Sequence, residues 1–544
     1  MNHPSQRSLP YELLFGAGFS ASQKPAVISF RRGKEQQLTF GQLEQQAQQL
    51  AQGLMKAGLR PRHRVLVLTT PGPDLFVVLF GLLLGGMVPV LVDPGLGLQR
   101  MLDCTRDAQI QGVISVWRAW LLRWLRPGVF KGVRLWITTD RRLPGLHSLR
   151  DVMRGEPVQL PKVTPDDTAL IAFTSGSTGP PKGVELTYRN LQGMFEAFRV
   201  LLGKQEPDEV DMIALPALSL ISAALGRTCL VPEIDFAHLS TVDVEHLLAY
   251  FRHYSICTAF LSPILCSKLA EHARQHPVRL ERTRVILTGG APIPNSVSLM
   301  MTKLLPNGEF YTPYGATEVL PATIIRAREI IEETAALTAQ GKGVCVGRPL
   351  LQTEICIMRP VDEPVPSEQE IQFQPPGEIG EIIISGIQVS PRYFGKERET
   401  QMAKIPRTNG GLWHRMGDLG YLDEQGRLWF CGRKKHQVRS SVRTYYPVCV
   451  EGIVNTLPFV RCSALVGVGP HGDQNPVLLI EPFAPPSAAQ RKTWQQQIID
   501  LLHQHDITIK HVIFYPKAFP TDRRHNSKIE RLDLARWVAK RWSI

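Results

Sequence analysis

Residues 173–183 read Phe-Thr-Ser-Gly-Ser-Thr-Gly-Pro-Pro-Lys-Gly and combine glycines, hydroxyl groups and one lysine at high density. Glycines let backbone N–H groups approach phosphate oxygens, hydroxyls add donors, and Lys182 brings a mobile positive charge. The P-loop pattern does not match, because Gly183 follows Lys182 where a P-loop has Ser or Thr. The chemistry indicated is the binding of a triphosphate, and ATP is the expected ligand.

The segment 311–318, Tyr-Thr-Pro-Tyr-Gly-Ala-Thr-Glu, carries a second set of groups that suit a nucleotide. An aromatic face can stack on a purine, and the Thr317 hydroxyl can donate a hydrogen bond to a phosphate oxygen. Glu318 supplies the hard oxygen ligand that Mg²⁺ prefers. We therefore expect Mg²⁺ to be bound together with ATP.

These segments occur in a fixed order along the chain: 173–183, Gly-Gly-Ala-Pro at 289–292, 311–318, and Met-Gly-Asp-Leu-Gly at 416–420. The ordered series resembles the acyl-adenylate-forming superfamily, which contains acyl-CoA synthetases, luciferases and peptide-synthetase adenylation domains. The resemblance extends over roughly residues 10 to 540. It implies an ATP-dependent acid ligase, in which a carboxylate attacks the α-phosphorus of ATP to give an acyl adenylate and pyrophosphate.

The resemblance also implies roles for individual residues of this sequence. The implied catalytic residues are Lys182, Thr317, Glu318 and Lys528, with Glu318 as the Mg²⁺ ligand. The implied ATP-binding residues are Thr174, Ser175, Gly176, Ser177, Thr178, Gly179, Gly289, Gly290, Ala291, Tyr314, Gly315, Ala316, Asp418 and Arg433. Asp418 is the implied acceptor for the ribose hydroxyls, and Lys435 is the implied hinge. Ser527 departs from the family, which usually has glycine before the catalytic lysine.

Strand and helix patterns alternate without internal repeats, which predicts an α/β fold. A chain of 544 residues is too long for a single core, so a large and a small domain are expected. The resemblance implies the adenylate-forming enzyme fold. Its large N-terminal domain, residues 1–434, would bind ATP and the acyl group and would contain α/β subdomains and a β-rich section. Residues 435–544 would form a small, mobile C-terminal α/β lid that carries the catalytic lysine.

Two segments raise the question of a membrane. Residues 75–92 are almost all apolar, which approaches the length of a membrane span. The Gly85-Gly86 pair and Pro89 instead favour a buried helix at 75–84 followed by a strand at 88–92. Residues 117–126, Trp-Arg-Ala-Trp-Leu-Leu-Arg-Trp-Leu-Arg, have the spacing of a helix that could lie on a membrane surface or bind a partner. The favoured expectation is that its aromatic face packs against the sheet, with the arginines in water.

Composition restricts the compartment and the partners. Lys and Arg exceed Asp and Glu by 62 to 49, but the basic residues are dispersed and no nucleic-acid-binding motif is present, so nucleic acid is not an expected partner. The nine cysteines are odd in number and never spaced as C-x-x-C, which indicates neither disulfides nor a zinc site. Residues 1–20 show no signal peptide. A cytoplasmic enzyme with a small-molecule substrate is expected; peripheral membrane contact and contact with a partner enzyme are left open.

Several positions depart from the acyl-CoA ligases. In that subfamily a glycine seven residues after the hinge lies beside the pantetheine tunnel, and here Val442 takes its place. A β-branched side chain at this position is expected to crowd the path of the thiol. The usual Pro-x-x-His segment is replaced by 215–220, and the usual Thr-His-x-Asn segment reads Thr-Tyr-Arg-Asn at 187–190. These features resemble most the β-lactone synthetases of bacterial long-chain olefin biosynthesis.

That resemblance implies adenylation of a long-chain 2-alkyl-3-hydroxy acid, whose own hydroxyl then attacks the acyl carbon and expels AMP as a β-lactone forms. The alternative is a long-chain fatty acyl-CoA synthetase or a fatty acyl-AMP ligase. A non-catalytic acyl- or nucleotide-binding protein is disfavoured because Glu318 and Lys528 are present. The residues expected to line the alkyl-chain site are Leu215, Pro216, Leu218, Leu225 and Val319.

Overall fold

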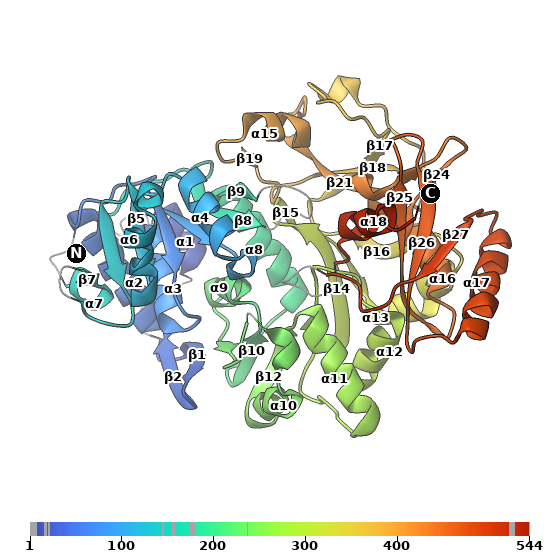
Figure 1. Cartoon of the computed structure of the whole chain (residues 1–544). Coiled ribbons are helices and arrows are strands. Elements are labelled where there is room, and N and C mark those ends of the chain that lie inside the picture. Colours follow the sequence, from blue (N-terminus) through green and yellow to red (C-terminus); the bar gives the residue numbers. More distant parts are fainter. Residues whose placement is uncertain are drawn as a thin grey trace.

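The computed structural model describes residues 8–15, 19, 22–143, 146–154, 158–174, 181–236, 238–521 and 528–542. As the sequence predicts, the chain is a mixed α/β protein with a large N-terminal domain and a smaller C-terminal one (Figure 1). Two large sheets form the N-terminal domain, and a separate small sheet forms the centre of the C-terminal domain.

The first large sheet has the strand order β19-β9-β8-β4-β3-β5-β6-β7. Strands β3 to β8 run parallel to one another, and β9 then returns antiparallel to β8. Consequently the carboxyl ends of β3 to β8 meet at one edge of the sheet, which is where α/β sheets bind ligands. The bounds are β3 (Arg64–Leu68), β4 (Val88–Val92), β5 (Gly112–Ser115), β6 (Leu135–Thr138), β7 (His147–Ser148), β8 (Thr168–Thr174), β9 (Lys182–Thr187) and β19 (Arg392–Tyr393).

The apolar run at 75–92 is confirmed as a buried helix and a strand, α3 (Pro73–Leu84) and β4. Every residue of α3 from Leu75 onward is buried, and the helix packs closely on α2 (Phe40–Lys56). A Cβ placed on Gly81 would lie 3.1 Å from the carbonyl oxygen of Ala47 in α2, so this glycine allows the close approach. In the part of the chain that the structure describes, no helix is long and apolar enough to cross a membrane.

The Trp- and Arg-rich segment forms two single-turn helices, α5 (Trp117–Trp120) and α6 (Leu122–Leu125). Trp117 and Trp120 are half-buried, as expected for packing on the sheet. The expectation is wrong for Trp124, whose side chain is 70% exposed. The reason is that Trp120 already occupies the space beside the sheet, and Trp124 stacks edge-on against its outer side with the ring centroids 5.9 Å apart.

The second large sheet has 14 strands, in the order β17-β18-β21-β22-β16-β15-β14-β13-β12-β10-β11-β1-β2 with β20 beside β21. Strands β10, β12, β13 and β14 run parallel, whereas the section from β14 to β22 is antiparallel, as the expected β-rich section requires. The bounds are β1 (Pro25–Arg31), β2 (Lys34–Thr39), β10 (Glu209–Ile213), β11 (Cys229–Val231), β12 (Ser255–Phe260), β13 (Val285–Leu287), β14 (Glu309–Ala316), β15 (Val319–Arg326), β16 (Val344–Pro349), β17 (Glu354–Met358), β18 (Gly380–Ser385), β20 (Lys404–Pro406), β21 (Leu412–Leu422) and β22 (Leu428–Arg433).

Helices cover both sheets (Figure 1). The helix α8 begins at a capping box formed by Thr187 and Asn190, and the Asn190 amide also donates to the carbonyl oxygens of Ile387 and Val389, both at 2.9 Å. In this chain the Thr-Tyr-Arg-Asn segment therefore ties α8 to the loop before β19. The remaining N-terminal helices include α1 (Leu9–Leu14), α4 (Leu98–Asp107), α7 (Leu149–Val152), α8 (Tyr188–Leu202), α9 (Pro216–Ala224), α10 (Val244–His253), α11 (Pro263–Gln275), α12 (Asn295–Leu304), α13 (Ala327–Glu329), α14 (Ala335–Ala339) and α15 (Glu397–Ala403).

The C-terminal domain has hydrophobic cores of its own, formed among the described residues from Val438 onward. We retain the boundary at residues 434 and 435 as a proposal that these separate cores support. The domain contacts the N-terminal domain closely, since a Cβ on Gly452 would lie 2.6 Å from the carbonyl oxygen of Thr338. Its elements are β23 (Val438–Arg439), β24 (Thr444–Tyr445), α16 (Pro447–Val454), β25 (Val460–Val468), β26 (Asn475–Pro482), α17 (Ala488–His503), β27 (His511–Phe514) and α18 (Arg531–Ala539).

Candidate active site

The predicted phosphate loop joins β8 to β9 at the carboxyl edge of the first sheet. The two strands pair so that Lys182 lies opposite Thr174, which fixes where the loop leaves and rejoins the sheet. Lys182 Nζ lies 4.8 Å from the ring centroid of Tyr393, a cation–π contact that holds the ammonium beside the loop. The predicted residues Ser175, Gly176, Ser177, Thr178 and Gly179 lie outside the described residues, as does the side chain of Thr174.

The predicted metal ligand Glu318 lies in the tight turn that joins β14 to β15, next to Thr317. Gly315 allows this turn, because a Cβ there would lie 2.6 Å from the carbonyl oxygen of Val319. The Tyr393 hydroxyl donates to Glu318 Oε1 at 2.7 Å. Burial, and then the Glu318 carboxylate, raise the pKa of Tyr393 far above its usual value, so its hydroxyl remains a donor. Tyr393 thus links the carboxylate to Lys182.

The Gly-Gly-Ala turn that follows β13 lies against this same hairpin. A Cβ on Gly289 would be 3.4 Å from the carbonyl oxygen of Pro313 in β14, and Gly290 has a positive φ of 99°. The structure therefore brings together two segments that the sequence separates by about twenty residues. Gly289, Gly290 and Ala291 remain predicted to contact the nucleotide.

Asp418 is the most buried charged group of the site. Its Oδ2 accepts a hydrogen bond from the Tyr314 hydroxyl at 2.6 Å, and its Oδ1 lies 3.0 Å from Arg433 Nε, directly across strands β21 and β22. Burial raises the pKa of Asp418, whereas Arg433, Tyr314 and then Lys528 act in the opposite direction. Oδ1 is buried and, although it is paired with Arg433, it accepts no well-aligned hydrogen bond from the described residues, so it suits a ribose hydroxyl.

The C-terminal domain contributes charges to this region. The positive charge of Lys528 acts on Asp418, so this lysine of the C-terminal domain lies within electrostatic reach of that carboxylate. Lys435, the predicted hinge, has its pKa lowered to about 8 by burial and by the neighbouring Arg433, while Glu530 of the C-terminal domain acts to raise it. The predicted lid and the predicted hinge thus contribute charges near the carboxylate that is predicted to bind the ribose.

Sequence reasoning missed Lys404, a fully buried lysine whose Nζ donates to Ser390 Oγ at 3.1 Å. Ser390 N in turn donates to the carbonyl oxygen of Glu318 at 2.8 Å. Burial lowers the pKa of Lys404 to about 7, and Glu318 acts to raise it. Nothing in the local pattern Met-Ala-Lys-Ile-Pro separates this lysine from a surface one, because its burial arises from tertiary packing.

Lys404 is expected to make stability depend on pH. Its pKa is about 7 in the folded protein against an ordinary value of 10.5, so between these values the unfolded chain binds a proton that the folded protein does not. Stability therefore rises with pH across this window, by up to about 1.4 kcal/mol per pH unit. Thermal unfolding of wild type and Lys404→Met between pH 6.5 and 9.5 measures this pH dependence. As the pH rises, the stability of the wild type should increase relative to that of the variant. A pH-independent difference contradicts the prediction; the exposed Lys540→Met is the control.

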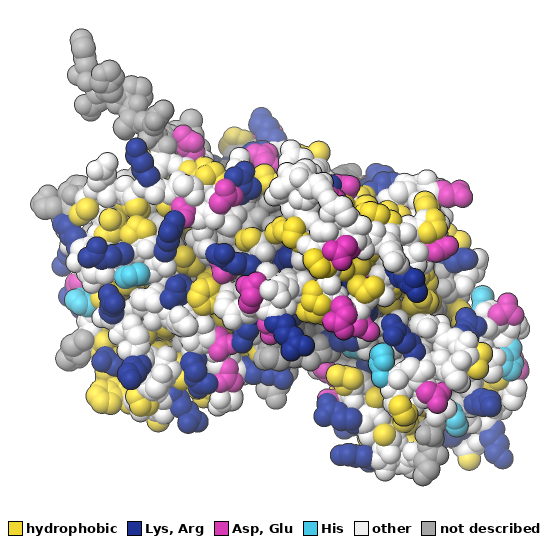
Figure 2. Space-filling view, turned by 90° about the horizontal axis from the view of Figure 1, so that it is seen from above, with side chains coloured by type: hydrophobic (Ala, Val, Ile, Leu, Met, Phe, Trp, Pro, Cys, Tyr) yellow, Lys and Arg dark blue, Asp and Glu magenta, His cyan; other side chains and the backbone are white. Residues whose placement is uncertain are grey.

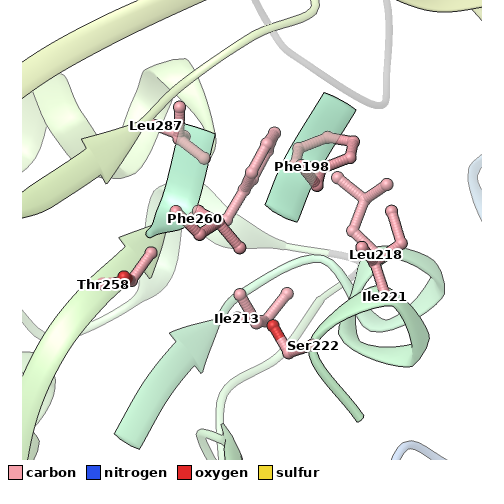
Figure 3. A pocket seen from close by; sticks show the side chains of 9 residues that line it. Phe198, Ile213, Leu218, Ile221, Ser222, Thr258, Phe260 and Leu287 are labelled. Carbon is pink, nitrogen blue, oxygen red and sulfur yellow. The ribbon is translucent and has the colours of Figure 1, made fainter. Parts of the chain in front are cut away.

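A small apolar cavity lies between the second sheet and the helices α8 and α9 (Figure 3). Of the residues predicted for the alkyl chain, Leu218 lines it, whereas Leu215 and Leu225 pack on the surrounding core and Val319 belongs to another cluster beneath Tyr314. The side chain of Pro216 is outside the described residues. The cavity lining is Phe198, Leu202, Ile213, Leu218, Ile221, Ser222, Thr258, Phe260 and Leu287.

This cavity is small. Its volume is about 10 Å³, which is the room of a single water molecule. A long alkyl chain can enter only if α9 or the side chains of α8 move away from the sheet.

The fold and the site together define the class of protein. The predicted phosphate loop leaves and rejoins the first sheet at position 174 and Lys182, the buried carboxylate of Asp418 is paired with Arg433, and the acidic turn residue Glu318 accepts from Tyr393. The pattern that describes the AMP-binding enzymes matches residues 19–394. The chain belongs to this family, and it is an ATP-dependent, acid-activating enzyme.

The chain is also similar in sequence to individual proteins of known activity. The chain is 36% identical over 513 residues to the olefin beta-lactone synthetase of Xanthomonas campestris pv. campestris, covering 92% of this chain and 91% of the relative. It is 36% identical over 512 residues to the olefin beta-lactone synthetase of Stenotrophomonas maltophilia, with the same coverage. A feruloyl-CoA synthase of Amycolatopsis is 29% identical over 453 residues, 82% of this chain and 84% of that protein.

Solved structures agree on the fold. A chimera described as ATP-bound RpMatB-BxBclM superposes with a TM-score of 0.78 at 20% identity, covering 98% of this chain and 99% of the other. The O-succinylbenzoate coenzyme A synthetase of Bacillus subtilis, in complex with ATP and magnesium ion, superposes with a TM-score of 0.71 at 22% identity, covering 94% and 96%.

Proposed function

We propose that this enzyme adenylates a long-chain 2-alkyl-3-hydroxy acid and then closes it to a β-lactone. A carboxylate oxygen attacks the α-phosphorus of ATP and pyrophosphate leaves. The 3-hydroxyl oxygen then attacks the acyl carbon, the bond from that carbon to AMP breaks, and the hydroxyl proton is released. The observation that carries the proposal is the 36% identity to olefin beta-lactone synthetases over 92% of the chain.

The residues of the site suit the first step. We propose that Asp418 Oδ1 holds a ribose hydroxyl, that Arg433 fixes this carboxylate, and that Lys182 and Lys528 offset charge as pyrophosphate leaves. Glu318 would hold Mg²⁺, which would offset the negative charge of the phosphates. Within the described ranges, no group of three or more His, Cys, Asp or Glu side chains gathers to hold a metal ion.

The second step, attack on the acyl adenylate, distinguishes the proposed β-lactone synthetase from an acyl-CoA synthetase. Val442 lies at the tip of the turn between β23 and β24, where the Ser440 hydroxyl accepts from the backbone N–H of Val442 and Arg443. Its side chain is 88% exposed in this domain arrangement. We propose that Val442 occupies the thiol path when the C-terminal domain turns, so that no external thiol competes with the hydroxyl of the substrate.

Product analysis tests the proposed function. Purified enzyme with ATP, Mg²⁺ and a 2-alkyl-3-hydroxy acid should yield AMP, pyrophosphate and a β-lactone by mass spectrometry, at a rate that CoA does not change. A fatty acid without the 3-hydroxyl should stop at the adenylate. The Val442→Gly variant should keep lactone formation, since the turn is exposed. Formation of a thioester from plain fatty acid and CoA at a comparable rate would establish the acyl-CoA synthetase alternative instead.

The alkyl-chain site is tested separately. Affinity should rise with chain length, by about 0.8 kcal/mol or fourfold for each buried methylene. Leu218→Trp fills the cavity beneath α9 and should lower turnover of long-chain acids at least tenfold, about 1.4 kcal/mol, while short-chain acids are less affected. Turnover is measured over a series of chain lengths, with Leu351→Trp at an exposed position as the control. Equal losses for all chain lengths would place the alkyl chain elsewhere.

We also propose a cytoplasmic enzyme, because all nine cysteines are free thiols and most of them are buried. Its partner is a small-molecule acid. Peripheral contact with a membrane and contact with other enzymes of olefin formation belong to the same proposal, since a long-chain substrate and its lactone are poorly soluble in water.

A further inference from the structure

The surface around α5 and α6 exposes large hydrophobic side chains. Leu121 is 44% exposed, and Trp124 and Leu125 are each 70% exposed. With Leu98 at 55%, four of the twelve strongly exposed large hydrophobic residues in the described chain fall within residues 98–125. Exposed apolar side chains gathered in this way indicate an interaction surface, whereas single ones do not.

The charges of this segment are of one sign. Residues 112–139 contain Arg118, Arg123, Arg126, Lys131 and Arg134 but no Asp or Glu. All five basic side chains are exposed, and within the described residues none of them forms an ion pair. Elsewhere on the surface many arginines are paired with acidic side chains, as Arg252 is with Glu245 at 2.8 Å. Figure 2 shows hydrophobic, basic and acidic side chains interspersed over one face of the molecule.

The position of the segment relates it to the active site. It begins immediately after the carboxyl end of β5, and the phosphate loop begins after the carboxyl end of β8 in the same parallel sheet. The strand order β8-β4-β3-β5 puts three strand spacings between them, roughly 15 Å. Leu98 follows β4 on this same edge. The exposed hydrophobic groups and the strand end at position 174, where the predicted phosphate loop begins, therefore share one edge of the first sheet.

We propose that Leu121, Trp124 and Leu125, with Arg118, Arg123 and Arg126, form a docking surface for an anionic lipid bilayer, here called the Trp–Arg patch. Tryptophan is favoured at the membrane–water interface, and leucines enter the acyl boundary while arginines pair with anionic headgroups. Two helices of one turn each are too short to form a stable helix-in-groove contact with a protein. The inference rests on the proposed function and deepens it, because it names the surface by which the enzyme would contact a membrane.

Vesicle binding tests the Trp–Arg patch. The whole protein is sedimented with vesicles of phosphatidylcholine, with or without phosphatidylglycerol. Wild type should bind the anionic vesicles, and high salt should release it. The double variants Trp124→Ser/Leu125→Ser and Arg123→Glu/Arg126→Glu should each lower binding about tenfold or more. The matched controls Phe483→Ser, also 70% exposed, and Arg491→Glu/Lys492→Glu on α17 should bind like wild type.

Three results would overturn the proposal: no binding of wild type to anionic vesicles, equal binding to neutral vesicles, or undiminished binding by the patch variants. Pyrophosphate release from a short, soluble acid reports separately on folding, and it should be unchanged in the patch variants. Lactone analysis with detergent-dispersed substrate distinguishes failure of the membrane inference from failure of the proposed function. Loss of vesicle binding together with loss of pyrophosphate release would attribute the effect to misfolding and count against the patch.

Discussion

Replacing Glu318 by Gln should lower ATP-dependent turnover by about 10² to 10³-fold, or about 2.7 to 4 kcal/mol. The amide keeps the size of the side chain and can still accept from Tyr393, but it lacks the negative charge that a Mg²⁺ ligand needs. Steady-state pyrophosphate release over a range of Mg²⁺ concentrations measures the loss, and excess Mg²⁺ should restore part of it. Unchanged turnover at limiting Mg²⁺ would exclude Glu318 as the metal residue.

Tyr393→Phe is the matched control for this carboxylate. It removes the 2.7 Å hydrogen bond to Glu318 Oε1 but keeps the ring under Lys182. We expect a smaller loss, about tenfold, because the carboxylate keeps its charge and loses only its orientation. A loss as large as that of Glu318→Gln would show that the hydroxyl has a role of its own.

Replacing Lys528 by Ala should remove most β-lactone formation, by about 10² to 10³-fold, because a positive charge beside the developing anhydride is lost in a closed site. Lys528 acts on the same buried region as Asp418, so binding of the nucleotide should weaken less than turnover. Rapid quenching with radiolabelled ATP, followed by separation of adenylate and lactone, measures both steps. The exposed Lys517→Ala in the same domain is the control. Retention of normal turnover by Lys528→Ala would remove this lysine from the catalytic set.

Much of the fold follows from local patterns. The apolar run at 75–92 divides at Gly85-Gly86 as expected, into the helix α3 and the strand β4. The start of a helix is harder to predict: α17 begins at Ala488, because Ser487 and Gln490 form a capping box outside any apolar pattern. Trp124 shows the other limit, since a period of aromatic residues cannot tell which of them the sheet has room to cover.

Some residues of the candidate site could be predicted from the sequence, and others could not. Asp418 and Glu318 stand in recognisable motifs, and they lie where hydrogen bonds and charge suit a nucleotide. Tyr393 and Lys404, which surround Glu318, could not be found because their segments have no distinctive spacing and reach the site only through β19 and β20. The small volume of the cavity beneath α9 was also unpredictable, since apolar composition gives no measure of free volume.

The pairing of Asp418 with Arg433 has a thermodynamic consequence. Arg433 ends strand β22 and lies two residues before Lys435, the proposed hinge. A turn of the C-terminal domain about that hinge would act on the arginine that is paired with Asp418, the proposed ribose-binding carboxylate. Nucleotide binding would then be coupled to the orientation of the C-terminal domain. Thermodynamic linkage is reciprocal: AMP binding changes the equilibrium constant between two domain orientations by the same factor by which the AMP affinities of those orientations differ. A bulkier residue at Gly452, where the domains touch, would therefore alter product inhibition by AMP without contacting the nucleotide.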